Sequence, residues 1–164
     1  MVPKRLCYFG DSASIHLVRW ANFSLRNGWE VHLVSDRQPC KGYADGVMHH
    51  RIRTPTSYSI PLPFITRFWV TMKLISTVRK IEPTIIHAHS IPGYGDYMGI
   101  LSKILPDVPI VVTAWGFSHM ESELSRPMRY FLSRMALRSA DAVTASAPSM
   151  SHKLSEAYGL DKTK

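Results

Sequence analysis

Short apolar segments alternate with longer segments of helical spacing along most of the 164 residues, and this alternation strongly limits the possible folds. The apolar segments are continuous instead of alternating with polar residues, which is typical of parallel strands buried on both faces. The sequence therefore predicts an α/β domain: a doubly wound, Rossmann-like parallel sheet of about six strands with helices on both faces. The expected strands are 5–9, 30–35, 47–53, 84–89, 109–114 and 142–145, and the expected helices are 15–27, 64–81, 96–105, 128–139 and 149–158.

Length and composition fit one globular domain. Hydrophobic residues make up 45% of the chain and charged residues 20%, which argues against disorder and against a coiled coil. A chain of this length suits one domain and is short for two, so we expect residues 1–164 to form a single domain. The net charge of +8 favours anionic partners, without choosing among nucleic acid, an acidic membrane surface and phosphorylated substrates.

The cysteines and the apolar segments bear on location. Cys7 and Cys40 cannot form a disulfide framework, and two free thiols fit a reducing cytoplasm. No secretory signal is visible. A membrane span needs about 20 mostly apolar residues, whereas the most apolar stretch, 60–75, is interrupted by Pro61, Pro63, Arg67 and Lys73. The sequence thus predicts a cytoplasmic protein.

Ligands of a doubly wound sheet bind outside the carboxyl ends of its strands. The loop Gly10–Ser14 joins the first strand to the first helix, where Gly10 permits close backbone approach and the helix N-terminus offers N–H groups to an anion. The loop lacks G-x-G-x-x-G and Gly-Lys-Ser/Thr patterns, which disfavours NAD or ATP domains of those types. Ser12 and Ser14 could equally cap the helix. The substrate-binding candidates here are Gly10, Asp11, Ser12, Ser14 and His16.

A second group of candidates follows the fourth and fifth strands. His87 and His89 share one face of a strand, with His89 at its carboxyl end and His87 deeper, as a hydrogen-bonded core residue. Metal binding is disfavoured because no Cys or carboxylate joins the pair at ligand spacing. The turn with Gly93 and Tyr94 fits either an anion cradle or a plain tight turn. Trp115, followed by Gly116, could wall a sugar-binding cleft or cap the core.

The predicted helix 64–81 mixes aromatic and basic residues. Basic side chains beside exposed aromatics suit an anionic membrane surface. The other interpretation is a crossover helix that buries its aromatics on the sheet.

Four segments together resemble a known family. They are KRLCYFGDSASIHLVRWANFSLRNGWEVHLVS, IEPTIIHAHS with GYGDYMGILSK, PIVVTAWG, and SADAVTASAPSMSHKLSEAYGL. The chain resembles the N-terminal half of a GT-B-fold glycosyltransferase of family 4, also called group 1. The resemblance covers nearly the whole chain and implies an acceptor-binding Rossmann-like domain whose partner domain binds the nucleotide sugar.

The resemblance also implies site residues. His89 matches the second His of an H-A-H element, Trp115 and Gly116 match a W-G element, and Ser146 follows the last strand. Where relatives read Gly-Ser-Asp, this chain reads Gly116-Phe-Ser-His119 and offers no carboxylate. The catalytic candidates are therefore His89 and His119. The full set of substrate-binding candidates is Gly10, Asp11, Ser12, Ser14, His16, Gly93, Tyr94, Trp115, Gly116 and Ser146.

The resemblance leads to a functional expectation. The chain would be the acceptor-binding half of an enzyme that moves a sugar from a nucleotide sugar to a glycan or lipid-linked acceptor. Transfer would retain anomeric configuration and need neither metal nor cofactor besides the nucleotide sugar as co-substrate. The chain would be inactive alone, because the donor domain, in cis or in trans, is absent from it. We also expect a peripheral position at the inner face of the cell membrane.

Two other interpretations of the function stay open. One is a non-catalytic module that binds a membrane surface or an anion, and the other is a docking subunit of a split glycosyltransferase. Nucleic-acid binding rests on charge alone, and we expect none. A Ser-His-Asp hydrolase is not supported, because the sequence has no G-x-S-x-G element.

Overall fold

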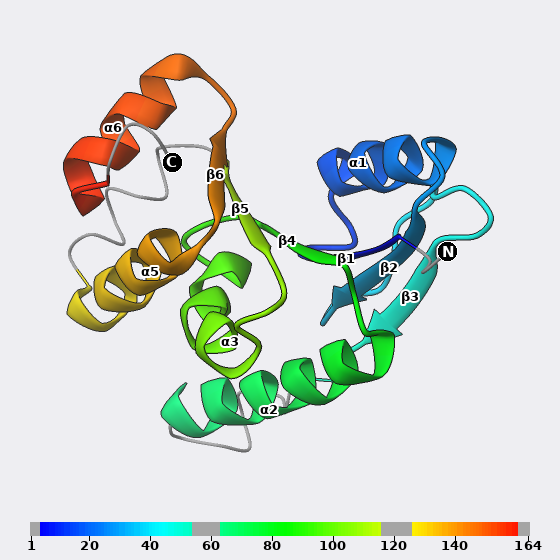
Figure 1. The fold of residues 1–164 in the computed structure, drawn as a ribbon, viewed down its shortest axis with the longest axis horizontal. Helices are drawn as coiled ribbons and strands as arrows, with labels where there is room; N and C mark the ends of the chain where they lie inside the picture. The colour runs from blue at the N-terminus through cyan, green and yellow to red at the C-terminus, as the bar shows by residue number, and fades with distance from the viewer. Residues whose placement is uncertain (1–3, 54–62, 116–125, 161–164) are drawn as a thin grey trace. The chain divides into compact units, whose positions relative to one another are not determined.

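The computed structural model describes residues 4–53, 63–115 and 126–160. Three parallel strands lie in the order β3 (Met48–Arg51), β2 (Glu30–Ser35), β1 (Arg5–Phe9), and three more parallel strands lie in the order β4 (Ile85–His89), β5 (Ile110–Ala114), β6 (Ala142–Ala145). The chain divides into two compact units, residues 1–84 and 85–164, and each contributes three of these strands (Figure 1). The predicted doubly wound α/β fold is confirmed.

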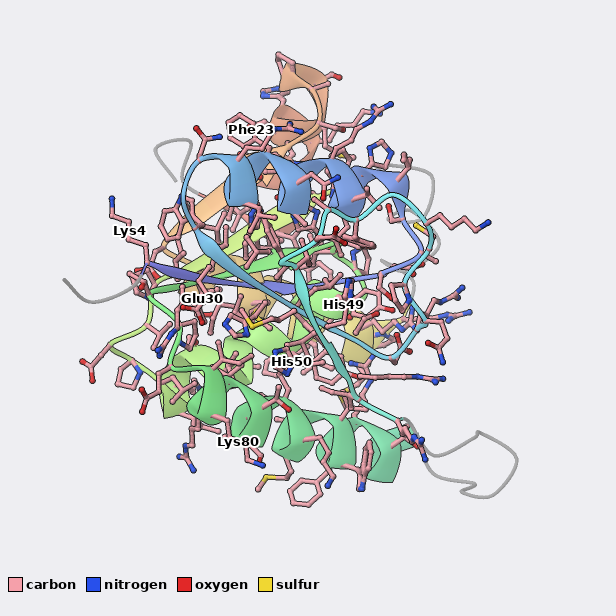
Figure 2. All side chains as sticks on the ribbon, turned by 90° about the vertical axis from the view of Figure 1, so that its right-hand side faces the viewer. Lys4, Phe23, Glu30, His49, His50 and Lys80 are labelled. Carbon is pink, nitrogen blue, oxygen red and sulfur yellow. The ribbon has the colours of Figure 1, made fainter. Side chains whose placement is uncertain are left out.

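The first unit contains three strands and two helices. In order these are β1 (Arg5–Phe9), α1 (Ile15–Arg26), β2 (Glu30–Ser35), β3 (Met48–Arg51) and α2 (Pro63–Ile81). Strand β2 pairs in parallel with both β1 and β3. Figure 2 shows the strands between the two helices, so this part of the sheet is covered on both faces, as predicted.

Residues on opposite faces of β1 contact the two helices, so α1 and α2 lie on opposite faces of these strands. The Tyr8 hydroxyl lies 2.8 Å from Ser24 Oγ on α1. Side chains at odd spacings along a strand point to opposite faces, so Arg5 faces away from Tyr8. Arg5 donates a hydrogen bond from Nη1 to the Ile81 carbonyl at the end of α2, at 3.1 Å. Both helices bury residues at helical spacing: Leu17, Val18, Ala21 and Ser24 on α1, and Val70, Leu74, Ile75, Val78 and Ile81 on α2.

The second unit continues the alternation. It contains β4 (Ile85–His89), the 3₁₀ helix η1 (Tyr94–Tyr97), α3 (Met98–Ile104), β5 (Ile110–Ala114), α5 (Pro127–Ser139), β6 (Ala142–Ala145) and α6 (Pro148–Tyr158). Strand β5 pairs in parallel with β4 and β6. Pro127 and Pro148 open their helices at the first position, where a missing N–H costs no hydrogen bond.

Two elements differ from the expected bounds. The helix expected over 96–105 is preceded by η1, so helical structure begins at Tyr94 and becomes α-helical only at Met98. The strand expected over 47–53 is shorter, Met48–Arg51, and largely exposed because it pairs with β2 on one side only among the described strands. The remaining strands lie within one residue of the expected bounds.

Candidate functional site

The loop after β1 is tied to the segment after β2 by hydrogen bonds through one serine. The Ser12 N–H donates to Ser35 Oγ at 3.1 Å, and the Ser12 hydroxyl donates to the Arg37 carbonyl at 2.8 Å. The Tyr43 hydroxyl donates to the Ser12 carbonyl at 3.1 Å. Ser12 is 1% exposed, so its hydroxyl stabilises the loop. Of the two alternatives for these serines, side-chain capping is not observed: Ser14 occupies the N-cap of α1 but makes no side-chain capping hydrogen bond.

Two charged residues pair beside this loop: the half-buried Asp11 within it and the exposed Arg37 after β2. Asp11 Oδ1 accepts the Ala13 N–H at 2.9 Å, and Oδ2 lies 3.7 Å from Arg37 Nε. His16, in the first turn of α1, is exposed. Gly10 donates its N–H to the Val34 carbonyl at 3.2 Å, which fixes the loop at the carboxyl end of β2. This edge of the first unit therefore presents Asp11, Arg37 and His16 to solvent beside a fixed backbone.

Polar side chains form a ladder across the three strands of the second unit. His87 Nε2 lies 2.6 Å from Thr113 Oγ1, which lies 2.6 Å from Thr144 Oγ1. Burial lowers the pKa of His87 to about 4, so the ring is neutral at neutral pH. The prediction of a hydrogen-bonded core histidine at this position is confirmed.

His89 and Trp115 meet at the carboxyl ends of β4 and β5. His89 is 4% exposed, and its Nδ1 accepts the Trp115 indole N–H at 3.3 Å. The chain turns at once after β4, because Ser90 has a φ of +76°, a left-handed conformation that non-glycine residues seldom adopt. Such residues cluster at functional sites.

The other candidates of this unit lie on the loops that follow its strands. Gly93, with a φ of +134°, precedes η1, whose first residue is the half-buried Tyr94. Ser146 is exposed directly after β6. Gly116 and His119 lie outside the described residues, so the assignment of His119 as a catalytic candidate stays a prediction.

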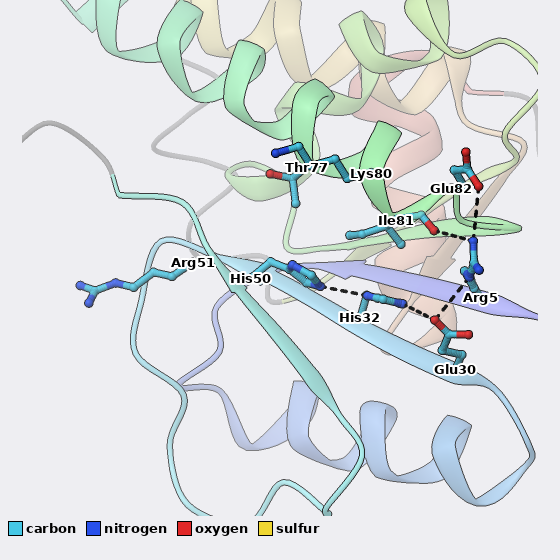
Figure 3. Close-up of a pocket in the computed structure, with 9 residues that line it drawn as sticks. All are labelled: Arg5, Glu30, His32, His50, Arg51, Thr77, Lys80, Ile81 and Glu82. Atoms are coloured by element: carbon cyan, nitrogen blue, oxygen red, sulfur yellow. Dashed lines mark hydrogen bonds and ion pairs between the residues drawn. The ribbon is translucent and has the colours of Figure 1, made fainter.

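The first unit also contains a polar cleft that the sequence interpretation missed. It measures about 600 Å³ and lies between the strands and the last turns of α2 (Figure 3). Its lining residues are Arg5, Glu30, His32, His50, Arg51, Thr77, Lys80, Ile81 and Glu82.

A chain of hydrogen bonds and ion pairs runs along the strand side of this cleft. His32 lies 2.9 Å from His50 through Nδ1 and 2.9 Å from Glu30 Oε1 through Nε2. Arg5 Nε is 3.3 Å from the same carboxylate oxygen. The hydrogen bond from His32 lowers the pKa of Glu30, and Arg5 adds to the effect. Burial is the main cause that lowers the pKa of His50, and the nearby His32 lowers it further.

A sequence signal for this cleft existed. Glu30 and His32 alternate with the apolar Val31 and Leu33, which predicts one polar and one apolar face for β2. A strand buried by helices on both faces would be apolar on both.

Among the described residues, no group of three or more His, Cys, Asp or Glu side chains is placed to hold a metal ion.

Comparison with known proteins identifies the class. The family described as "Glycosyl transferase 4-like" matches residues 5–147. This match covers most of the chain, and the protein belongs to that family, as the sequence predicted. No curated protein sequence matches the chain.

Solved structures share the fold at low sequence identity. The chain is similar to sucrose-phosphate synthase from Thermosynechococcus elongatus, with a TM-score of 0.70 and 14% identity over 93% of this chain and 45% of that one. It is also similar to a glycosyltransferase from Rickettsia africae, with a TM-score of 0.64 and 14% identity over 100% of this chain and 42% of that one. UDP-GlcNAc 2-epimerase from Methanocaldococcus jannaschii gives a TM-score of 0.65 at 10% identity, over 98% of this chain and 44% of that one.

The chain thus spans less than half the length of these three proteins. Because the names of these proteins include a synthase, a glycosyltransferase and an epimerase, the structural likeness defines the fold alone.

Proposed function

We propose that the chain is the acceptor-binding half of a glycosyltransferase that moves a sugar from a nucleotide sugar to a glycan or lipid-linked acceptor. The observation that carries the proposal is the family match over residues 5–147. The likeness to less than half of each of the solved structures above supports a division of labour, in which another domain, in cis or in trans, binds the nucleotide sugar.

Each unit contributes a candidate acceptor surface at the carboxyl ends of its strands. In the first unit the groups are the half-buried Asp11 and the exposed Arg37 and His16. In the second unit the buried His89 and the half-buried Trp115 lie at these strand ends. Carboxylate, guanidinium, imidazole and indole groups can together donate and accept hydrogen bonds, as sugar hydroxyls require. Transfer with retention and without metal remains part of the proposal.

The test is transfer of a radiolabelled sugar to lipid-linked or glycan acceptors by the chain together with its donor domain. The proposal expects transfer with both parts and none with this chain alone. Asp11→Asn should raise KM for the acceptor more than KM for the nucleotide sugar. Equal effects on both substrates would contradict the assignment of this loop to the acceptor.

An anionic membrane surface is the second partner that we propose, and the exposed face of α2 supports it. Phe68 and Met72 are 61% and 49% exposed, one turn apart on that helix. Lys73 Nζ lies 5.5 Å from the centre of the Trp69 ring. Lys73, Arg79 and Lys80 are exposed as well, and apolar and basic side chains on one helix favour the surface of anionic lipid. No described helix is long and apolar enough to span a membrane.

Vesicle flotation tests the membrane proposal. Binding to phosphatidylglycerol vesicles should exceed binding to phosphatidylcholine vesicles and weaken with salt. Replacing Lys73 and Arg79 by Gln should weaken binding by about 2 kcal/mol, since each basic group near the surface contributes about 1 kcal/mol. The control variant with Lys103→Gln and Lys153→Gln has the same net charge as the variant on α2. It should bind anionic vesicles as strongly as the wild type does. Equal loss in both variants would show that net charge, and not α2, governs binding.

A further inference from the structure

The charges that line the polar cleft of the first unit leave a positive excess. The charged lining residues are three cations and two anions, namely Arg5, Arg51, Lys80, Glu30 and Glu82. Both carboxylates already face Arg5, with Glu30 at 3.3 Å from Nε and Glu82 at 3.6 Å from Nη1. Among the described residues Lys80 makes no hydrogen bond or ion pair, and Arg51 uses only Nε, toward the Asp36 carbonyl at 3.4 Å. The unpaired charge therefore favours an anionic ligand.

The hydrogen-bond chain on the strand side of the cleft fixes where its protons lie. Glu30 is ionised at neutral pH, since His32 and then Arg5 lower its pKa, and a carboxylate can only accept hydrogen bonds. His32 Nε2, 2.9 Å from Glu30 Oε1, must therefore donate. In a neutral His32 ring, Nδ1 then accepts the proton of His50 Nε2 at 2.9 Å, so His50 Nδ1 keeps a lone pair.

This last nitrogen is accessible. His50 lines the cleft, and its Nδ1 is absent from the buried side-chain atoms that lack a partner among the described residues. Since His50 also has no contact besides those given above and the ring stack on His32, solvent or a ligand reaches Nδ1. Figure 3 shows His50 on the strand side of the cleft and Lys80 on the α2 side.

An anion in the cleft would change the chain by one proton. The lone pair of His50 Nδ1 repels the oxygens of an anion, whereas a protonated Nδ1 donates a hydrogen bond to them. When a solvent acid gives a proton to Nδ1, the proton on His50 Nε2 passes along the hydrogen bond to His32 Nδ1. His50 is then neutral again, and the positive charge lies on His32, beside the Glu30 carboxylate. Burial lowers the pKa of His50, so the charge is better placed on His32.

We propose that this cleft binds a phosphate group, which Lys80 attracts by charge and to which His50 donates a hydrogen bond after the uptake of one proton. A volume of about 600 Å³ suits a small molecule, and a sugar phosphate or a lipid head group supplies the same group. Arg5 and Glu30 begin their strands, whereas the loop with Asp11 follows the end of β1. The phosphate site is therefore separate from the candidate acceptor surface, and it does not depend on the glycosyltransferase function.

Calorimetry with sulfate tests the site, because sulfate keeps its two negative charges between pH 6 and pH 8 and has no proton to give. In buffers of different ionisation enthalpy, the chain should take up about one proton for each sulfate bound at pH 8. The affinity should rise by up to about tenfold for each pH unit as the pH falls. Sulfate binding without proton uptake, or no sulfate binding, would overturn the proposal.

Four variants locate the binding. Lys80→Gln should weaken sulfate binding by about three- to fivefold, and Arg79→Gln, which removes the same charge outside the cleft lining, should weaken it less. His50→Gln should abolish proton uptake. His49→Gln, at the next position of β3 with its ring against Tyr43, should retain it. Equal weakening in the two α2 variants, or proton uptake that persists in His50→Gln, would overturn the proposal.

Two further probes distinguish the sources of the phosphate. Glucose 6-phosphate represents a soluble ester, and vesicles that contain phosphatidic acid represent a lipid head group, with phosphatidylglycerol vesicles as the reference for membrane charge. Binding of glucose 6-phosphate, or a preference for phosphatidic acid, that is lost in His50→Gln supports the site and identifies its source. If neither probe shows binding that requires His50, the proposal is overturned.

Discussion

At the scale of single residues, buried titratable groups couple the stability of the chain to pH. His87 has an ordinary pKa of 6.5 when unfolded and about 4 when folded, because burial disfavours the imidazolium. The unfolded state therefore binds more protons between these values, so stability is full above pH 6.5 and is lost as pH falls toward 4. At about 1.4 kcal/mol for each pH unit, the loss is roughly 3 kcal/mol.

Urea unfolding at pH 7 and pH 4 measures this loss. His87→Gln should have a lower free energy of unfolding at pH 7, because Thr113 loses one of its two side-chain hydrogen-bond partners. Its free energy of unfolding should decrease less between pH 7 and pH 4. His152→Gln removes an exposed histidine on α6 and should retain the pH dependence of the wild type. The same pH dependence in His87→Gln and in the wild type would show that another group is responsible.

Glu30 gives a second pH dependence of the same sign in a more acidic range. Its pKa is lowered from an ordinary 4.5, first by the hydrogen bond from His32 and then by Arg5. Stability from this carboxylate is present above pH 4.5 and is lost as pH falls through the lower, folded pKa. Glu30→Gln should flatten the stability profile below pH 4.5, as measured by urea unfolding. Glu82 is the more exposed of the two carboxylates paired with Arg5. As the control, Glu82→Gln should leave the stability profile below pH 4.5 nearly unchanged.

At the scale of elements, the helices α3 and α5 approach closely at one glycine. A Cβ on Gly99 would lie 2.8 Å from Met135 Cγ and 2.9 Å from the Ala136 backbone nitrogen. Gly99→Ala should therefore destabilise the chain by about 1–3 kcal/mol through overpacking, although alanine favours a helix by about 1 kcal/mol over glycine. Thermal unfolding measures the change. Lys103→Ala, on the exposed side of the same helix, should change stability by less than about 0.5 kcal/mol, and a more stable Gly99→Ala would contradict the packing argument.

The elements themselves were largely predictable from sequence, because continuous apolar strands and helical spacing leave few other folds. The interactions at the site were less predictable. The sequence left capping and ligand contact equally open for Ser12, but Ser35, Arg37 and Tyr43 come from a segment more than twenty residues away and use its polar groups instead. The cleft beside Glu30 and His32 escaped prediction for a similar reason, because its other wall is the end of α2.

At the scale of the whole molecule, a division of labour between domains has a direct consequence for binding. If the nucleotide-sugar site lies on another domain, the present chain should bind common UDP- and GDP-sugars no more tightly than millimolar. Calorimetry on the chain alone, and then with the donor domain added, measures both states. Affinity should appear only with the donor domain, and His89→Gln should leave the donor affinity of that assembly within about twofold if His89 contacts the acceptor. Micromolar binding by the chain alone would place the donor site among its own residues, and the acceptor role would then have to be abandoned.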